Sequence, residues 1–141
     1  MRFTLYLHPL ASFCHKVLIA LYENDVPFAP VTVDLGDPGD AAMHLARWPV
    51  GKIPVLYDDA ERRIVPETSI IIEYLQDRAP GRVPMLPADP DSRREARLWD
   101  RFFDQYVAVP MQKIVLDRIR PEDGRDPLGV AEARAQHAPP D

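Results

Sequence analysis

Residues 51–56 (Gly-Lys-Ile-Pro-Val-Leu) constrain the fold more than any other stretch of the chain. Proline has no backbone N–H to donate to a sheet, so Pro54 belongs at the first residue of a strand or at a bulge. The Ile53–Pro54 bond is also a candidate for the cis form. A cis bond there would leave backbone groups free to bind a small peptide as an added strand. The hexapeptide alone is also consistent with an ordinary strand start and a trans proline.

Length and composition predict a globular chain with one domain and part of a second. The chain has 141 residues, of which 46% are hydrophobic and 28% charged, enough to bury a core. A net charge of -5 without a basic patch argues against a nucleic-acid partner. A single cysteine, Cys14, excludes an internal disulfide and fits a reducing compartment. Because no leader and no stretch of about 20 apolar residues is found, we expect a cytoplasmic protein without a membrane partner.

Hydrophobic patterning over the first part of the chain predicts strands alternating with helices. Ser12 is placed to cap the first helix and Asp40 the second, while the polar residues 58–63 are expected to form a solvated turn. In order, we expect a strand at 3–7, a helix at 12–23, strands at 28–33 and 54–57 around a short helix at 41–45, a strand at 64–65 and a helix from 67 to about 80.

The rest of the chain is predicted to be helical. Residues 82–91 contain three prolines and suggest a linker, after which Ser92 and Glu95 form a capping-box pattern. Pro110 is expected to kink the helix that follows, and a short helical pattern spans 129–135. One face of the long helix carries a row of aromatic residues, namely Trp99, Phe102, Phe103 and Tyr106.

Three predicted features are expected to meet at one edge of a small mixed sheet. They are the helix starting near Ser12, the helix starting at Glu67 and Thr68, and the turn at Pro54. Helix N-termini carry unpaired N–H groups and partial positive charge, so they favour carboxylates and thiolates. Thr68 and the adjacent Ser69 are placed to bind a carboxylate, and Glu67 an ammonium group. This arrangement suits a small zwitterionic peptide with an anionic sulfur.

Four segments in this order resemble the N-terminal, thioredoxin-like domain of glutathione S-transferases. The resemblance implies an α/β fold, with a thioredoxin-like βαβ-α-ββα domain over residues 1–80. A linker at 81–91 and a short, incomplete all-α domain at 92–141 would follow. Because the family's helical domain is usually larger, it also implies a truncated or fragmentary chain with a partly uncovered aromatic row. The segments are residues 5–9, 12–17, 51–56 and 66–71, and the similarity continues through 97–103.

The resemblance implies that the chain is a glutathione transferase. The enzyme would activate the thiolate of glutathione for attack on a small hydrophobic electrophile, as in detoxification, and would form a homodimer. Pro54 would be cis, and the backbone of Ile53 would hold the cysteinyl part of glutathione. Glu67 and Thr68 would bind the γ-glutamyl end and Lys52 the glycine carboxylate. The sulfur would lie at the start of the first helix.

The first helix departs from the family pattern, because Ala11 occupies the position of the catalytic serine in serine-using members. Ser12 is the candidate catalytic residue in its place, although it is equally suited to be only an N-cap. Cys14 matches the second cysteine of a thioredoxin-type pair and is either a buried core residue or a reactive thiol. Two alternatives therefore stay open: a glutathione-binding protein without transferase activity, and a thiol-disulfide oxidoreductase that uses Cys14.

No metal site is predicted. Structural zinc sites in proteins use ligands at characteristic short spacings, and the histidines show no such spacing. These histidines are His8, His15, His44 and His137.

Overall fold

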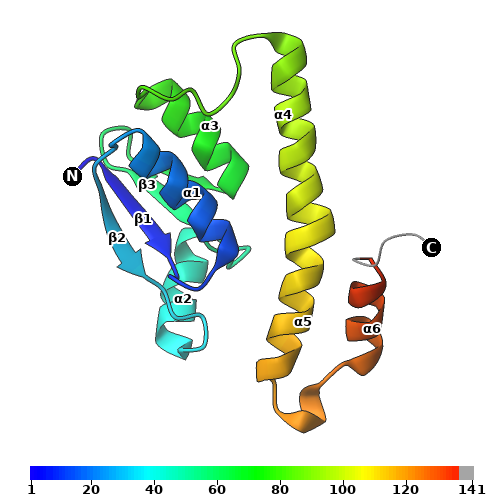
Figure 1. Cartoon of the computed structure of the whole chain (residues 1–141). Helices are drawn as coiled ribbons and strands as arrows, with labels where there is room; N and C mark the ends of the chain where they lie inside the picture. Colours follow the sequence, from blue (N-terminus) through cyan, green and yellow to red (C-terminus); the bar gives the residue numbers. More distant parts are fainter. Residues whose placement is uncertain (137–141) are drawn as a thin grey trace. The chain divides into compact units, whose positions relative to one another are not determined.

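The structure, a computed structural model, describes residues 1–136 and divides into two compact units (Figure 1). The first unit covers Met1–Pro87, and the second begins at Ala88. His137 and the part of the expected helical domain at 137–141 lie outside the described residues.

A four-stranded sheet in the order β2-β1-β3-β4 forms the centre of the first unit. β1 pairs in parallel with β2 and antiparallel with β3, which pairs antiparallel with β4. This mixed sheet with its helices confirms the predicted thioredoxin-like α/β fold. The elements are β1 (Phe3–Leu7), α1 (Ser12–Glu23), β2 (Phe28–Thr32), α2 (Pro38–Arg47), β3 (Val55–Asp58), β4 (Arg63–Pro66) and α3 (Thr68–Arg78).

One face of the sheet is buried under α1 and α3, which lie beside each other on it (Figure 1). β1 alternates buried and half-buried residues, as period-two patterning requires. On α1, Cys14, Val17 and Leu21 follow the i, i+3, i+7 spacing that turns one helical face to a core. The cluster comprises Phe3, Leu5, Leu7, Cys14, Val17, Leu21, Leu56, Val65, Ile71 and Leu75.

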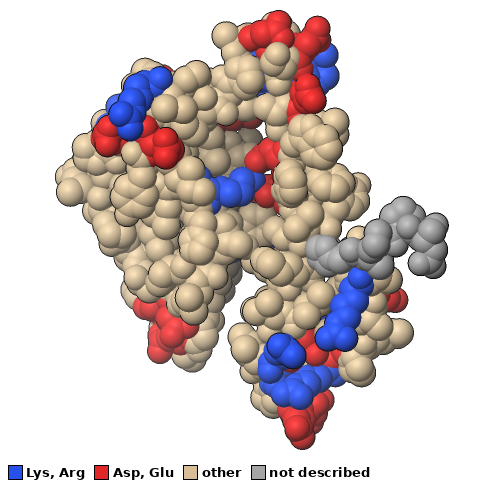
Figure 2. Space-filling view, in the orientation of Figure 1, with Lys and Arg blue, Asp and Glu red and all other residues tan. Residues whose placement is uncertain are grey.

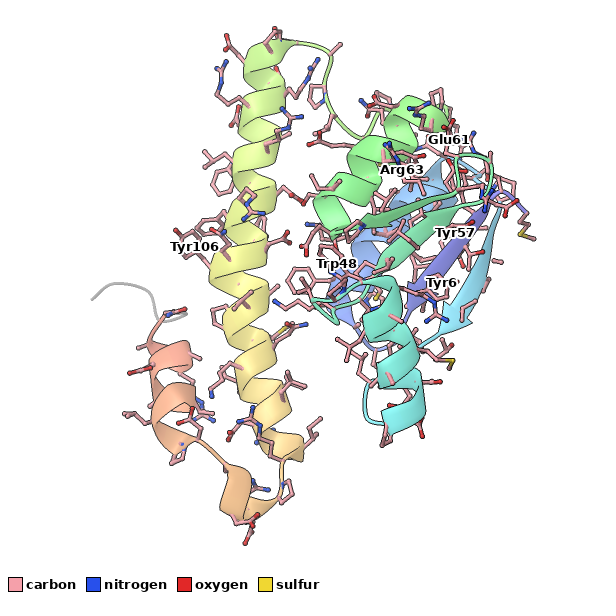
Figure 3. The ribbon with its side chains drawn as sticks, turned by 180° about the vertical axis from the view of Figure 1, so that it is seen from behind. Tyr6, Trp48, Tyr57, Glu61, Arg63 and Tyr106 are labelled. Atoms are coloured by element: carbon pink, nitrogen blue, oxygen red, sulfur yellow. The ribbon has the colours of Figure 1, made fainter. Side chains whose placement is uncertain are left out.

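The opposite face of the sheet carries Tyr6 on β1 and Tyr57 on β3, which are neighbouring strands (Figure 3). The guanidinium of Arg47, at the end of α2, lies 4.3 Å from the centre of the Tyr6 ring. A cation over an aromatic face is attracted by the ring quadrupole, so this contact helps to hold the end of α2 against the sheet.

Both predicted N-caps in this unit are wrong. Ala11 is the N-cap of α1 and makes no side-chain cap bond, which leaves Ser12 as the first helical residue. α2 begins earlier than expected, because Asp37 accepts hydrogen bonds from the N–H groups of Gly39 and Asp40 at 2.9 Å. Pro38 follows at the first helical position, where its missing N–H costs nothing.

Replacing Asp37 with alanine is expected to lower the free energy of unfolding by about 1 kcal/mol, because two N–H groups of α2 lose their acceptor. Urea denaturation of the full chain measures the effect. Asp37→Asn keeps a side-chain oxygen at the same place and should stay close to the wild type. Equal losses in both variants would contradict the capping role.

The expectation that residues 58–63 form a solvated turn is wrong for Asp58, which is buried. Its side chain is 0% exposed and receives hydrogen bonds from Arg2 at 2.8 Å and from the hydroxyl of Tyr74 at 2.9 Å. The N–H of Ala60 adds a bond at 3.0 Å. Asp58 therefore connects the start of the chain, the β3–β4 turn and α3.

The second unit is a long helical run followed by a short helix. The predicted capping box is wrong: Asp89 caps α4 by accepting from the N–H of Ser92 at 2.8 Å. Pro110 lies in the first turn of α5, directly after a π-helical segment, and the backbone stays helical there, so the expected kink stays a prediction. A wider turn relieves the clash of the proline ring with the preceding carbonyls. The elements are α4 (Pro90–Phe102), η1 (Phe103–Ala108), α5 (Val109–Ile119), η2 (Glu122–Gly124) and α6 (Pro127–Ala135).

The aromatic row of the second unit is exposed, and its rings pack on one another. Ring centres of neighbouring members lie 5.5 to 6.2 Å apart.

On the face seen in Figure 2, basic side chains lie beside acidic ones instead of forming a continuous basic surface. Within residues 1–136, no helix is both long and apolar enough to cross a bilayer.

Candidate functional site

Three strand ends meet at one end of the sheet in the first unit. Tyr6, near the end of β1, pairs with Val55 at the start of β3, and Val55 pairs with Pro66 at the end of β4. α1 follows β1 through a short turn, and α3 follows β4 directly. The sheet register therefore brings the N-termini of both helices to the segment that precedes β3.

That segment contains the Ile53–Pro54 peptide bond, which is cis in the structure. Pro54 is buried and Ile53 is half-buried. Among the described residues, neither the N–H nor the C=O of Ile53 forms a backbone hydrogen bond. An unpaired donor and acceptor thus lie at the end of the sheet, where an extended peptide is able to pair with them.

The turn between α2 and β3 has little conformational freedom. The N–H of Gly51 donates to the carbonyl of Trp48 at 2.8 Å, and Gly51 has a φ of 70°, in the left-handed region. A Cβ at Gly51 would lie 2.9 Å from a terminal methyl of Leu45, so a larger residue requires that side chain to shift in addition to the left-handed backbone. Figure 3 shows Trp48 in this turn. The side chain of Lys52 is exposed, and its carbonyl accepts a hydrogen bond from His44.

The start of α1 places a hydroxyl in a buried position. Ser12 Oγ has almost no solvent contact and no hydrogen-bond partner in the structure. Buried hydroxyls are normally bonded, since an unmade bond costs about 1–3 kcal/mol. The Oγ atom therefore has hydrogen-bonding capacity that the described residues do not use.

Cys14 lies two residues further along α1 and is 0% exposed. Burial raises the pKa of the Cys14 thiol, against a smaller lowering effect of a hydrogen bond with the backbone of His8. Reactive cysteines have depressed pKa values and are partly exposed. Cys14 thus has the properties of a core residue.

The start of α3 is tied to the start of α1. Thr68 is 6% exposed and its hydroxyl donates to the carbonyl of Phe13 at 3.2 Å. The preceding residue, Glu67, is exposed and has a φ of 70°. A non-glycine residue in the left-handed region costs about 1–3 kcal/mol, and such residues cluster at ligand sites. Neither helix has an acidic residue in its first turn to occupy its N-terminal N–H groups.

Comparison with known proteins identifies the family of this chain. Residues 5–83 match the family model of the glutathione S-transferase N-terminal domain. The chain belongs to the glutathione S-transferase family. The match runs from the middle of β1 to beyond the end of α3, and so includes the strand ends and helix starts that form the site.

Individual relatives agree with this assignment. A glutathione S-transferase of Pseudomonas putida is 33% identical over 101 residues, or 72% of this chain and 43% of that protein. A stringent starvation protein A homolog of Histophilus somni is 37% identical over 95 residues, or 67% of this chain and 42% of that protein. The chain therefore spans about two fifths of the length of these relatives.

A solved glutathione S-transferase of Methylobacterium radiotolerans, in complex with glutathione sulfonate, has the same fold. It superposes with a TM-score of 0.80 at 31% identity, and the alignment covers 96% of this chain and 62% of the other.

The structure brings most of the candidate residues of this transferase-family chain to one end of the sheet: Ser12, Ile53, Pro54, Glu67 and Thr68. The side chain of Lys52 is exposed beside them, whereas Cys14 is buried. The buried His44 was not predicted, because the spacing of the histidines bears only on metal binding. A polar ring on the inner face of an amphipathic helix was the available signal. Among residues 1–136 no group of three or more His, Cys, Asp or Glu side chains is placed to hold a metal ion.

Proposed function

We propose that the chain binds glutathione at this end of the sheet and activates its thiol for transfer to a small hydrophobic electrophile. The unpaired backbone of Ile53, held beside the N-termini of α1 and α3, is the observation that carries the proposal. The cysteinyl part of glutathione would pair with Ile53 as a short added strand. The γ-glutamyl end would then extend toward α3.

Each charged end of the tripeptide has a partner in this arrangement. The exposed carboxylate of Glu67 receives the ammonium group, and the N–H groups at the start of α3, including that of Thr68, receive the α-carboxylate. Lys52 is placed to meet the glycine carboxylate. Since the Thr68 hydroxyl already donates to Phe13, Thr68 binds through its backbone.

The sulfur would lie at the start of α1, beside Ser12 Oγ. A hydrogen bond from this hydroxyl, with the N-terminal N–H groups of α1, stabilises the thiolate and lowers its pKa. The thiol proton leaves to solvent. The thiolate then forms a C–S bond with the electrophilic carbon, and the bond to the leaving group breaks. In family members that use serine, the hydroxyl is at the position of Ala11, so this role of Ser12 is specific to the proposal.

A second candidate is glutathione binding without transfer. It is favoured by Ala11 and by the similarity to a stringent starvation protein A homolog. This candidate would be supported if the chain binds glutathione but does not turn over an activated aryl chloride. The third alternative, disulfide chemistry at Cys14, is disfavoured by the burial and raised pKa of that thiol. A homodimer and a role in detoxification stay predictions of the family resemblance.

Calorimetric titration of the full 141-residue chain with glutathione tests the proposed site. We expect binding in the wild type, and affinity about tenfold lower in Glu67→Gln, because a charge-assisted contact to the ammonium group is lost.

Glu61→Gln is the matched control, since Glu61 lies in the β3–β4 turn, at the other end of these strands. It should bind as the wild type does. No binding in the wild type would refute the proposal, and equal losses in both variants would refute the placement of the γ-glutamyl end.

A further inference from the structure

His44 is a fully buried polar residue that the proposed chemistry does not use. It lies on α2, is 0% exposed, and places Nε2 2.9 Å from the carbonyl oxygen of Lys52. A carbonyl only accepts, so Nε2 carries the proton and donates. The other ring nitrogen, Nδ1, is buried and has no partner. The bond to Lys52 is therefore the polar contact that compensates for burying this ring.

The bonded carbonyl belongs to the same peptide unit as the N–H of Ile53. A trans peptide unit is planar, and its C=O and N–H point in opposite directions. Fixing the Lys52 carbonyl toward α2 therefore directs the Ile53 N–H away from α2. This N–H is one of the two backbone groups to which we assign the cysteinyl part of glutathione.

Other contacts fix the start of the turn but not this peptide unit. The N–H of Trp48 donates to the carbonyl of His44 at 2.9 Å, and Gly51 donates to Trp48 at 2.8 Å. Among the described residues, the Lys52 carbonyl has no hydrogen bond besides the one from His44. Without this bond, no hydrogen bond among the described residues holds the peptide unit between Lys52 and Ile53.

We infer that His44 is a positioning residue for glutathione, which it aligns through the peptide unit between Lys52 and Ile53. The inference rests on the proposed function. It assigns to α2 a role in ligand binding without any contact between α2 and the ligand. His44 acts by holding the Ile53 N–H in its binding direction before glutathione arrives, so its loss reduces affinity by allowing other orientations.

Two substitutions at His44 separate the hydrogen bond from the packing. His44→Phe fills similar space without a donor, whereas His44→Gln places an amide nitrogen near the position of Nε2. In calorimetric titrations of the full chain we expect the glutathione Kd of His44→Phe to rise about tenfold. For His44→Gln, which restores the donor, we expect a rise of less than about threefold.

Met43→Ala, at an exposed neighbour on the same helix, is the control and should leave the Kd unchanged. Urea denaturation of each variant gives its stability. A purely structural role would lower stability in His44→Phe but leave the Kd of the folded protein at the wild-type value, and this result would overturn the inference. A wild type that binds no glutathione would instead refute the proposed function, and the inference with it.

A measurement on the wild type decides the matter if His44→Phe does not fold. Nitrogen NMR of the labelled chain should show His44 protonated at Nε2, and the Ile53 amide signal should shift when glutathione is added. An Nε2 without a proton, or an unchanged Ile53 amide in the presence of bound glutathione, would overturn the inference.

Discussion

Replacing Ser12 with alanine is expected to lower kcat/KM for an activated aryl chloride by about 100-fold, the effect typical of losing one donor to a developing or stabilised anion. The reason is that Ser12 Oγ, buried and unpartnered in the structure, is the hydroxyl placed to donate to the thiolate. The affinity for glutathione should change far less than turnover. The pKa of the bound glutathione thiol should rise, which ultraviolet absorbance of the thiolate measures directly.

Cys14→Ala is the matched control, because it alters the neighbouring sulfur on the same helix and leaves the Ser12 hydroxyl in place. We expect it to retain turnover, since Cys14 is a core residue with a raised pKa. Turnover that survives in Ser12→Ala but is lost in folded Cys14→Ala would transfer the chemistry to the cysteine. Full turnover in both variants would show that neither Ser12 nor Cys14 is a catalytic residue.

Replacing Asp58 with asparagine is expected to lower the free energy of unfolding by about 2 kcal/mol at neutral pH. This is less than a fully buried ion pair would lose, because the side chain of Arg2 is 36% exposed. The carboxylate accepts from Nε and Nη2 of Arg2 at 3.0 and 2.8 Å and from Tyr74 at 2.9 Å. Urea denaturation monitored by circular dichroism measures the loss.

The same substitution should remove part of the pH dependence of stability. The hydrogen bond from Arg2 is the largest effect that lowers the pKa of Asp58, which falls to about 2 from an ordinary value of 3.8, although burial opposes it. A carboxyl group with a depressed folded-state pKa stabilises the fold above its unfolded-state pKa. Its contribution is therefore complete above about pH 4 and is lost as the pH falls toward 2.

Asp59→Asn is the control for Asp58, because this neighbouring carboxylate is exposed in the β3–β4 turn. This variant should have the same free energy of unfolding at neutral pH as the wild type, and the same decrease in stability between about pH 4 and 2. An Asp58→Asn chain with the same slope between about pH 4 and 2 as the wild type would contradict the assigned ion pair.

Local patterns in the sequence were sufficient to predict the order of strands and helices in the first unit. β1 buries every second residue, and α1 buries residues at the spacing i, i+3, i+7. Each pattern arises because the element has one buried face, and it can be read from a short stretch of sequence. Helix starts were harder to predict, since Asp40 and Ser92 each have a competing cap residue nearby and α1 begins after Ala11 without any side-chain cap. Asp37 and Asp89 precede prolines at first helical positions, and this combination was the better signal.

By itself, then, the sequence determined the α/β class, the strand at Val55 and the family to which the chain belongs, because these follow from periodicity and from contiguous segments. Only the tertiary structure showed that Asp58 is buried, that Thr68 bonds to Phe13, and that His44 holds the Lys52 carbonyl. The physical reason is distance along the chain: Thr68 and Phe13 are 55 positions apart. Whether a polar side chain is solvated or bonded depends on which segments the fold brings beside it, and no local pattern encodes that.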